Sequence, residues 1–491
     1  MRAGLLLLAA LCLLQAPWLA RPVHYDEANF LTLARGAAAD PWRPHDVRIN
    51  WQGTEERAFD VLSNPPGIAW WLAPVRKLSA LAQRLWMLCW LPLMVWGALG
   101  LSRQLGRGLP GAALLLVSPI VFLSIPALLP DAPLYALTLA GFAGFLSRSE
   151  SHRVAWPFAL MLGCAALFRY SAVVLPLVLG LWLWSRGRSP LGALWGWVPV
   201  GLLALHDLHA YGEVHLLAMG SFQAVSTSAA DLGHKAAASL AMLGGAAALP
   251  LMGWGRAQLV GAGLGGLAGA AWGPLGALFA ALGGAALLTR LWPPRGEDKA
   301  SFSELWLGAW AFGGALFLLT LRFSATRYWL PFLPPILLAF PPGRRPWLAP
   351  GLHLALGLAL AADELQSARA QEKLADTVAA LGVGGFTGHW GWQWAMEERG
   401  WRALDEGTTV PTGALVAIPT EAWPQPVIAR CERVLWSGGW SSSLGWMPRG
   451  YSREGEANLH ANWISGDPPT RTILPWTFAS DPYEQVKVCA E

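Results

Sequence analysis

Residues 85–101 read LWMLCWLPLMVWGALGL and residues 111–129 read GAALLLVSPIVFLSIPALL, with Arg103 and Arg107 in the turn between them. Each run approaches the ~20 apolar residues that a helix needs to cross the hydrocarbon core of a bilayer. Similar runs recur along the chain, separated by short turns that carry arginine. The pattern predicts a polytopic, all-α membrane protein.

The composition agrees with this fold class. Of the 491 residues, 54% are hydrophobic and only 13% are charged, whereas a soluble domain carries about 25% charged residues. The stretch 257–288 is rich in glycine and fits either two spans or one re-entrant pair. We count about thirteen candidate spans, at 3–20, 85–101, 111–129, 132–146, 155–168, 171–184, 191–205, 236–252, 257–271, 275–288, 305–321, 328–340 and 347–361.

Lys and Arg residues accumulate in alternate turns, as the positive-inside rule requires of cytoplasmic turns. The opposite turns are poorer in cations, and the turn at 129–131 has none. We therefore expect a multi-pass cytoplasmic (inner) membrane protein with a cytoplasmic N-terminus. The residues after Asp363 should then lie on the periplasmic or extracytoplasmic side. The cation-rich turns contain Arg103, Arg107, Arg148, Arg153, Arg186, Arg188, Arg256, Arg290, Arg295, Lys299, Arg344 and Arg345.

Two domains are predicted from the distribution of polar segments. Residues 1–362 form the transmembrane domain, with extracytoplasmic loops at 21–84 and 206–235. Within the first loop, residues 67–74 read as a helix lying in the membrane interface. Residues 363–491 form a small extracytoplasmic α/β domain, in which a helical pattern precedes strand-like runs such as GALVAIP and RCERVLW. Residues 3–20 also fit a cleaved signal peptide, but we favour an uncleaved helix.

The five cysteines fall into two groups. Cys12, Cys89 and Cys164 lie in predicted spans, where a thiol acts as a small apolar side chain. Cys431 and Cys489 both lie in the predicted extracytoplasmic domain. Because that compartment is oxidising, we expect these two residues to form a disulfide.

Acidic residues mark the start of the first loop and the next outward turn. Asp26 and Glu27 follow the first span, in HYDEANFLTLAR. A carboxylate beside apolar surface is a candidate general base, although an interfacial charge or a helix N-cap would explain it equally well. Asp131, in SIPALLPDAPLYAL, opens a helix and also fits an N-cap. The predicted topology places these acids on one face of the membrane.

Cations are expected on that same face. Arg169 and Tyr170 end one span, and Arg322, Arg327 and Tyr328 lie between two others. The planar guanidinium fork suits phosphate, because it makes paired charge-assisted hydrogen bonds. The alternative is that an arginine near a helix end simply extends its charge toward water.

The segment HDLHAYGEVH (206–215) contains residue types that bind metals. His206 and His209 are the candidate ligands for a divalent metal, but the segment does not supply a closed ligand set. Histidines in an extracytoplasmic loop also serve as ordinary polar surface. No other cofactor is indicated, and no step of the chemistry below uses a metal.

Five motifs, in this order, resemble the GT-C superfamily of membrane glycosyltransferases, which use polyprenyl-phosphate-linked sugars. The nearest branch contains protein O-mannosyltransferases and lipid A aminoarabinose transferases. A later segment, GHWGWQWAMEERG, is similar to parts of bacterial relatives. The basic residue that some relatives carry within the first loop has three candidates here: Arg43, Arg48 and Arg57. The five motifs are DEANFLTLAR, NPPGIAWWLAP, LPDAPLYALTLAGF, LFRYSAVVLPLVL and RFSATRYWLPFLPPILL.

The resemblance implies sugar transfer to a lipid, glycan or protein hydroxyl, and direct displacement of the donor phosphate would invert the anomeric configuration. We expect no nucleic-acid partner. Asp26 matches the family's base, with Glu27 as its neighbour, and Asp131 matches an acid that positions the acceptor. Basic residues near the donor phosphate are implied at Arg169 with Tyr170, and at Arg322, Arg327 and Tyr328. The alternative is a multi-span transporter of envelope lipid or glycan precursors, for which internal repeats and broken helices are typical.

Overall fold

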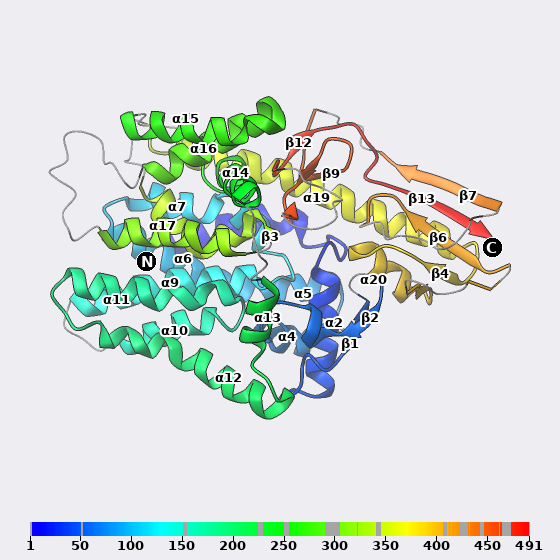
Figure 1. The fold of residues 1–491 in the computed structure, drawn as a ribbon, viewed down its shortest axis with the longest axis horizontal. Helices are drawn as coiled ribbons and strands as arrows, with labels where there is room; N and C mark the ends of the chain where they lie inside the picture. The colour runs from blue at the N-terminus through cyan, green and yellow to red at the C-terminus, as the bar shows by residue number, and fades with distance from the viewer. Residues whose placement is uncertain are drawn as a thin grey trace.

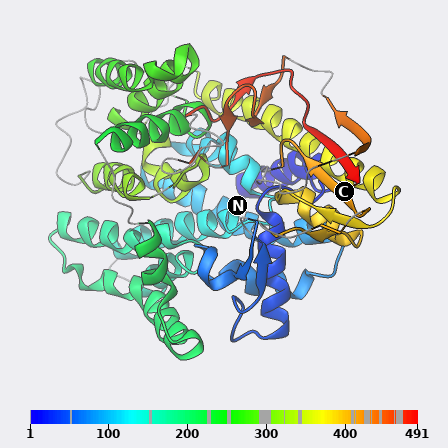
Figure 2. The same ribbon diagram turned by 45° about the vertical axis from the view of Figure 1, so that its right-hand side comes forward.

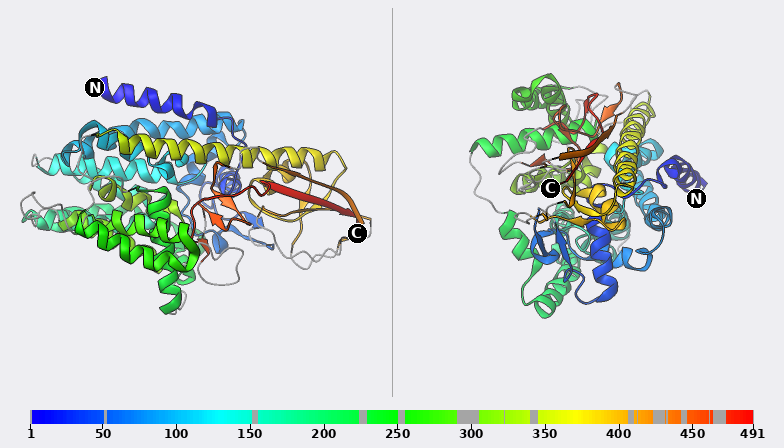
Figure 3. Two further views of the ribbon diagram at one scale, coloured as in Figure 1. Left: turned by 90° about the horizontal axis from the view of Figure 1, so that it is seen from above. Right: turned by 90° about the vertical axis from the view of Figure 1, so that its right-hand side faces the viewer.

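The computed structural model describes residues 2–50, 53–150, 155–223, 229–249, 255–289, 305–321, 323–339, 345–405, 410–411, 413–422, 431, 433–441, 446–460, 462–463 and 473–490. Helices gather at one end of the molecule and most strands at the other (Figure 1). The long helix α19 (Leu348–Ala379) runs from the helical end into the strand-containing end (Figure 3).

The helical end is a bundle of apolar helices interrupted by 3₁₀ segments. The 3₁₀ segments that bear on the site are η4 (Tyr170–Val174) and η8 (Thr326–Phe332). The α-helices are α1 (Arg2–Gln15), α6 (Leu91–Gln104), α7 (Gly108–Val117), α8 (Pro119–Ser124), α9 (Asp131–Glu150), α10 (Trp156–Ala165), α11 (Leu175–Ser185), α12 (Val198–Tyr211), α13 (His215–Gln223), α14 (Ala229–Ala246), α15 (Arg256–Gly269), α16 (Gly273–Leu288), α17 (Leu305–Thr320) and α18 (Leu333–Leu337).

Within the described residues, four helical stretches are long and apolar enough to cross a membrane: Ala80–Gln104, Pro190–Tyr211, Arg256–Leu288 and Leu348–Ala379. This supports a membrane protein, but not the predicted number of about thirteen spans. Other apolar runs form helices of 10–17 residues, among them Gly108–Val117 and Tyr170–Ser185.

Proline explains much of this difference, because it removes a backbone donor and its ring clashes with the preceding turn of a helix. The apolar run 111–129 is divided between α7 and α8, and Pro119 is the first residue of α8. Pro331 falls inside the 3₁₀ segment η8 and Pro334 near the start of α18, so the run 328–340 is also broken. Hydrophobicity alone therefore overstated helix length.

The glycine-rich stretch folds as a helical hairpin of α15 and α16. A Cβ added at Gly261 would lie 2.3 Å from the Gly284 carbonyl oxygen, and one at Gly265 would lie 2.1 Å from the Ala280 oxygen. The backbones of the two helices thus touch along a line of glycines spaced four residues apart. Small residues at this spacing are typical of helices that pack closely in membranes.

The first loop folds into short helices beside the bundle. Residues 67–74, predicted as an interfacial helix, contain α4 and the start of η2, but Ile68, Ala69 and Leu72 are buried in the protein core. The loop elements are α2 (Glu27–Ala39), β1 (Arg48–Asn50), β2 (Glu55–Arg57), α3 (Ala58–Val61), α4 (Gly67–Leu72), η2 (Ala73–Val75) and α5 (Ala80–Met87).

The C-terminal region contains a five-stranded mixed sheet, with the strand order β5-β4-β6-β13-β7. The strand β4 is parallel to β5 and β6, whereas β13 is antiparallel to β6 and β7. With α20 (Trp390–Glu398) beside the sheet, the predicted α/β character is confirmed. The sheet strands are β4 (Gly384–Phe386), β5 (Arg402–Ala403), β6 (Leu415–Pro419), β7 (Arg433–Trp440) and β13 (Glu484–Ala490).

A disulfide joins Cys431, just before β7, to Cys489 in β13. The predicted pairing is therefore confirmed. Cys12, Cys89 and Cys164 are free thiols, as expected of residues in apolar helices.

Two predicted boundaries fall inside helices. The division at 362/363 falls inside α19, so the last predicted span and the first helix of the tail are one element. The predicted loop at 206–235 begins within α12 and contains α13.

The tail contacts the helical bundle, since β11 (Asn462–Trp463) pairs with β3 (Phe323–Ser324). Figure 2 shows the tail strands beside the first-loop helices.

Candidate functional site

The site is built around a strained turn at residues 24–27. Tyr25 has a φ of 45°, in the left-handed region that a bulky residue rarely occupies. Its ring packs against two aromatic rings from the tail, with centroids 5.1 Å from Trp390 and 4.4 Å from His460. Backbone strain of this kind persists only where the surroundings hold it, and it is common at functional sites.

The turn gives its two acids different environments. The side chain of Asp26 is 17% exposed, whereas that of Glu27 is 1% exposed. Asp26 stands at the N-cap position of α2, but its carboxylate makes no capping hydrogen bond. Asp26 therefore lacks the side-chain hydrogen bond that the alternative interpretation, a helix cap, predicts.

Glu27 occupies the centre of a buried ion-pair network. Its carboxylate pairs with Arg84 at 2.7 Å and with Arg21 at 2.9 Å, and accepts backbone N–H bonds from His24 and Leu128. Burial alone would favour the neutral acid, but the two guanidinium groups outweigh it and lower the pKa of Glu27. Because its oxygens are fully engaged, Glu27 is suited to holding the turn in place and not to accepting a proton.

The same network reaches the tail. Arg21 also pairs with Glu364 of α19, and His460 lies 2.7 Å from that carboxylate through its Nε2. Arg84 extends it to the backbone, since its guanidinium donates to the carbonyls of Arg21, Pro22 and Pro126. First loop, span, long helix and tail thus meet around one group of charges. We call Arg21, Glu27, Arg84, Glu364 and His460 the buried hub.

Asp26 contacts a cation from a distant part of the chain. Arg327 of η8 donates from Nη2 to Asp26 Oδ2 at 2.5 Å. Burial opposes the charge of this guanidinium, but the carboxylates of Asp26 and Asp131 raise the pKa of Arg327. The arginine is therefore held in its charged form between two acids.

Asp131 makes the second pair. It begins α9 and is fully buried, and Arg169 donates to its Oδ1 at 2.8 Å. The Arg169 guanidinium lies 5.0 Å from the centroid of the Tyr328 ring. We call Asp26, Asp131, Arg169 and Arg327 the acid–arginine cluster; its members come from four separate segments.

Several polar atoms of the acid–arginine cluster are unsatisfied. Asp131 Oδ2, Arg169 Nε, and Nε and Nη1 of Arg327 have no hydrogen-bond partner among the residues that the structure describes. A buried polar group without a partner costs about 1–3 kcal/mol. A set of unsatisfied donors beside two carboxylates is the arrangement expected where a charged, polar ligand binds.

A small cavity adjoins the cluster. Its volume is about 10 Å³, and Asp131, Arg327, His24, Glu364 and His460 are among its lining residues. Burial and the nearby Arg21 lower the pKa of His24 to about 3, so this ring is neutral near pH 7. The cavity has room for about one water. A larger ligand therefore requires side chains to move, as is common in unliganded sites.

Other predicted site residues lie elsewhere. The hydroxyl of Tyr170 contacts Nδ1 of His215 at 2.8 Å. Arg322 lies outside the described residues. The structure therefore brings together Asp26, Asp131, Arg169, Arg327 and Tyr328, whereas Tyr170 pairs with His215.

The histidines of 206–215 connect α12 to the first loop. His206 contacts Asp207 at 3.1 Å and the backbone carbonyl of Trp42 at 2.8 Å. His209 is exposed, and its ring lies 5.9 Å from that of Trp42. Across the described part of the chain, no group of three or more His, Cys, Asp or Glu side chains is placed to hold a metal. The contacts favour a structural role for these histidines.

Sequence reasoning missed Arg84, Glu364 and His460. In the sequence, Arg84 marks only the end of the first loop, although a fully buried arginine at the start of a span needs an acidic partner. Glu364 had a comparable signal, because it follows an apolar stretch directly. His460 had none, since its position depends on how the tail docks.

Comparison of the chain with protein-family models, with curated proteins and with solved structures finds no match. The assignment of function therefore depends on the chemistry of the acid–arginine cluster and on the motifs themselves.

Proposed function

We propose that this protein is a membrane glycosyltransferase that moves a sugar from a polyprenyl-phosphate donor to a hydroxyl of an extracytoplasmic acceptor. The observation that supports it best is the acid–arginine cluster, where two acids and two arginines meet beside apolar helices. A transferase of this kind needs a base for the acceptor and fixed cations for the departing phosphate, together with a membrane surface for the lipid chain.

Asp26 is the proposed general base. Its carboxylate is the most exposed member of the cluster, at 17%, and it makes no helix-capping bond. An acceptor hydroxyl loses its proton to this carboxylate as its oxygen attacks the anomeric carbon. The bond from that carbon to the phosphate oxygen breaks in the same step, and the anomeric configuration inverts.

The arginines stabilise the leaving group. Nη2 of Arg327 donates to Asp26, so the Nε and Nη1 groups of Arg327 remain to donate to the phosphate. Nε of Arg169 is the other unsatisfied donor, while its Nη2 holds Asp131. Donors that are already fixed in place lower the barrier, because they need no reorganisation as charge develops on the phosphate. No general acid is required, since a phosphate leaves without protonation.

Asp131 and Glu27 have different proposed roles. Oδ2 of Asp131 is unsatisfied and buried beside the cavity, where it can accept a hydrogen bond from the acceptor. Glu27, which the family resemblance placed next to the base, is here a positioning residue: its contacts in the buried hub fix the turn that carries Asp26. The extracytoplasmic side is proposed from the arginine distribution and agrees with the Cys431–Cys489 disulfide.

The test is donor consumption by the purified full-length chain in lipid nanodiscs. A panel of radiolabelled polyprenyl-phosphate hexoses and pentoses is supplied with a cell-envelope extract as the acceptor pool, and free polyprenyl phosphate is measured. We expect release from at least one donor, and its loss in an Arg169→Gln/Arg327→Gln variant. Transport of an intact lipid-linked precursor across vesicle membranes, without consumption of any donor, would instead establish a transporter.

A further inference from the structure

A second polar pocket lies on the other side of the segment that leads to the acid–arginine cluster. Its volume is about 740 Å³, within the usual range for small-ligand sites. Pro22 and Val23 line this pocket, whereas their neighbours Arg21 and His24 line the small cavity of the candidate site. The two spaces therefore share one stretch of chain as a wall.

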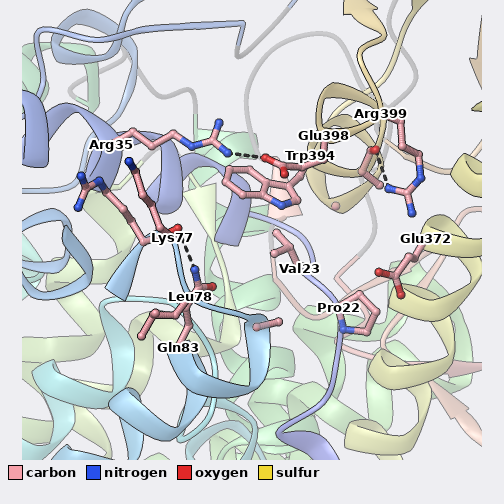
Figure 4. Close-up of a pocket in the computed structure, with 14 residues that line it drawn as sticks. Pro22, Val23, Arg35, Lys77, Leu78, Gln83, Glu372, Trp394, Glu398 and Arg399 are labelled. Atoms are coloured by element: carbon pink, nitrogen blue, oxygen red, sulfur yellow. Dashed lines mark hydrogen bonds and ion pairs between the residues drawn. The ribbon is translucent and has the colours of Figure 1, made fainter. Parts of the chain in front are cut away.

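The pocket is formed between the first loop and the tail (Figure 4). Arg35 of α2 and the segment 76–80 before α5 contribute one side, and Glu372 of α19 with residues of α20 contributes the other. Gly391 allows the close approach of α20, since a Cβ there would lie 2.3 Å from the Val23 carbonyl oxygen. Contacts that are this tight show that the two sides are packed together around the pocket.

Part of the charge in the pocket is already neutralised. Arg35 pairs with Glu398 at 2.6 Å and stacks on Trp394 at 4.1 Å, and Arg399 pairs with Asp376 at 2.6 Å. These ion pairs hold α20 in place, and the charges of Arg35, Glu398 and Arg399 are therefore largely compensated within the protein.

Three charged side chains remain for a ligand. Lys77 and Glu372 have no hydrogen-bond or ion-pair partner among the described residues, and the Arg76 guanidinium donates only to the Ala73 carbonyl there. In Figure 4, Lys77 and Glu372 lie on opposite sides of the pocket. Two cations and one carboxylate in the lining of one pocket fit a headgroup with a phosphate at one end and an amine at the other.

An apolar strip leads from the pocket along a candidate membrane span. Leu78 lines the pocket and is 53% exposed, and Leu81 and Leu85 on α5 are 46% and 48% exposed. Leu81 and Leu85 are four residues apart and lie on one face of the helix. Because α5 begins the candidate span Ala80–Gln104, this face is covered by lipid chains when the span is in a membrane.

We propose that this pocket binds the headgroup of a phosphoethanolamine-type lipid. Its phosphate lies between Arg76 and Lys77, its amine pairs with Glu372, and its chains follow Leu78, Leu81 and Leu85. The proposal does not depend on sugar transfer. A lipid bound here would brace Pro22 and Val23, and through them the segment that carries the strained turn at Tyr25.

The test is equilibrium binding of tritiated dioctanoyl phosphatidylethanolamine to the immobilised full-length protein in a non-ionic detergent. We expect Arg76→Gln/Lys77→Gln to weaken binding at least tenfold. Glu372→Gln should abolish the preference for this lipid over dioctanoyl phosphatidylglycerol, which has the phosphate without the amine. The matched control is Arg369→Gln/Lys487→Gln, which removes two exposed cations that do not line the pocket.

Three results would overturn the proposal. The first is equal binding by wild type and Arg76→Gln/Lys77→Gln. The second is an equal loss in the control variant, which would mean that only net charge matters. The third is tight binding of water-soluble phosphoethanolamine without its chains, which would identify a soluble ligand. Donor consumption is measured separately, so failure of this proposal is distinguishable from failure of the proposed transferase.

Discussion

Asp26 and Glu27 are adjacent in the chain, yet the fold gives them opposite tasks. The turn at Tyr25 directs Glu27 into the buried hub, while Asp26 keeps partial exposure and one contact to Arg327. Identical functional groups therefore differ in what they can do, because one carboxylate has every oxygen engaged and the other does not. This difference is the reason why we propose Asp26 as the base and Glu27 as a positioning residue.

The role of Glu27 predicts a stability effect. Glu27→Gln leaves Arg84 buried without its charged partner, and breaking a buried ion pair in this way costs about 3–5 kcal/mol. We expect a clear fall in the thermal unfolding midpoint in detergent. Glu56→Gln, an exposed acid in the same loop, is the control. An unchanged midpoint for Glu27→Gln would show that the buried hub does not hold the loop.

At the scale of elements, the α15–α16 hairpin depends on backbone contact between glycines. Gly265→Ala places a Cβ 2.1 Å from the Ala280 carbonyl oxygen, so the helices must separate. Gly263→Ala in the same helix meets nothing within 4 Å, and gains about 1 kcal/mol of helix propensity. Thermal unfolding should show a lower midpoint for the first variant only. Equal behaviour of the two would rule out close packing along this line.

The Cys431–Cys489 disulfide is expected to stabilise the sheet of the tail. It ties the beginning of β7 to β13 across a sequence separation of 58 residues. A loop of that length corresponds to about 4 kcal/mol in the chain-entropy model. Cys489→Ser should therefore lower the unfolding midpoint of the tail and increase its cleavage by protease, whereas Cys12→Ser should do neither. Free thiols at both positions in protein isolated from cells would contradict the extracytoplasmic assignment.

For the molecule as a whole, the sequence predicted the membrane character, the α/β tail and the placement of Asp26, Asp131, Arg169 and Arg327 on one face. These depend on apolar runs and helix ends, which are local signals. The sequence did not predict the helix break at Pro119 or the continuity of α19, because proline geometry and packing decide these features. The buried hub could not be predicted from the sequence, because His460 contacts Glu364 only after the tail has packed against the bundle.

Each buried histidine should lower the stability of the protein in acid, an effect that Glu421 and Glu484 oppose, because burial raises the pKa of these carboxyls to about 7 and about 8. Burial lowers the pKa of His24 and His45 to about 3, and of His215 and His389 to about 4. Below the unfolded pKa of about 6.5, only the unfolded state takes up these protons, so stability falls as pH falls. Each histidine contributes about 1.4 kcal/mol of this loss by pH 5.5.

The measurement is the unfolding midpoint between pH 7.5 and pH 5.5. His215→Gln should make the midpoint at pH 5.5 higher relative to that at pH 7.5 than it is in the wild type, whereas replacement of the exposed His209 by Gln should leave the dependence as in the wild type. The same pH dependence in His215→Gln and the wild type would contradict the prediction that burial keeps His215 neutral in the folded state.

The proposal that Asp26 in the acid–arginine cluster is the base for sugar transfer is tested by the turnover of Asp26→Asn with a saturating polyprenyl-phosphate donor. The amide keeps the shape and removes the proton acceptor, so the rate should fall by about 10²–10⁴-fold, while donor binding and the unfolding midpoint change little. Asp131→Asn should lose less, because it orients the acceptor. Turnover of Asp26→Asn within a few-fold of the wild type would contradict the account.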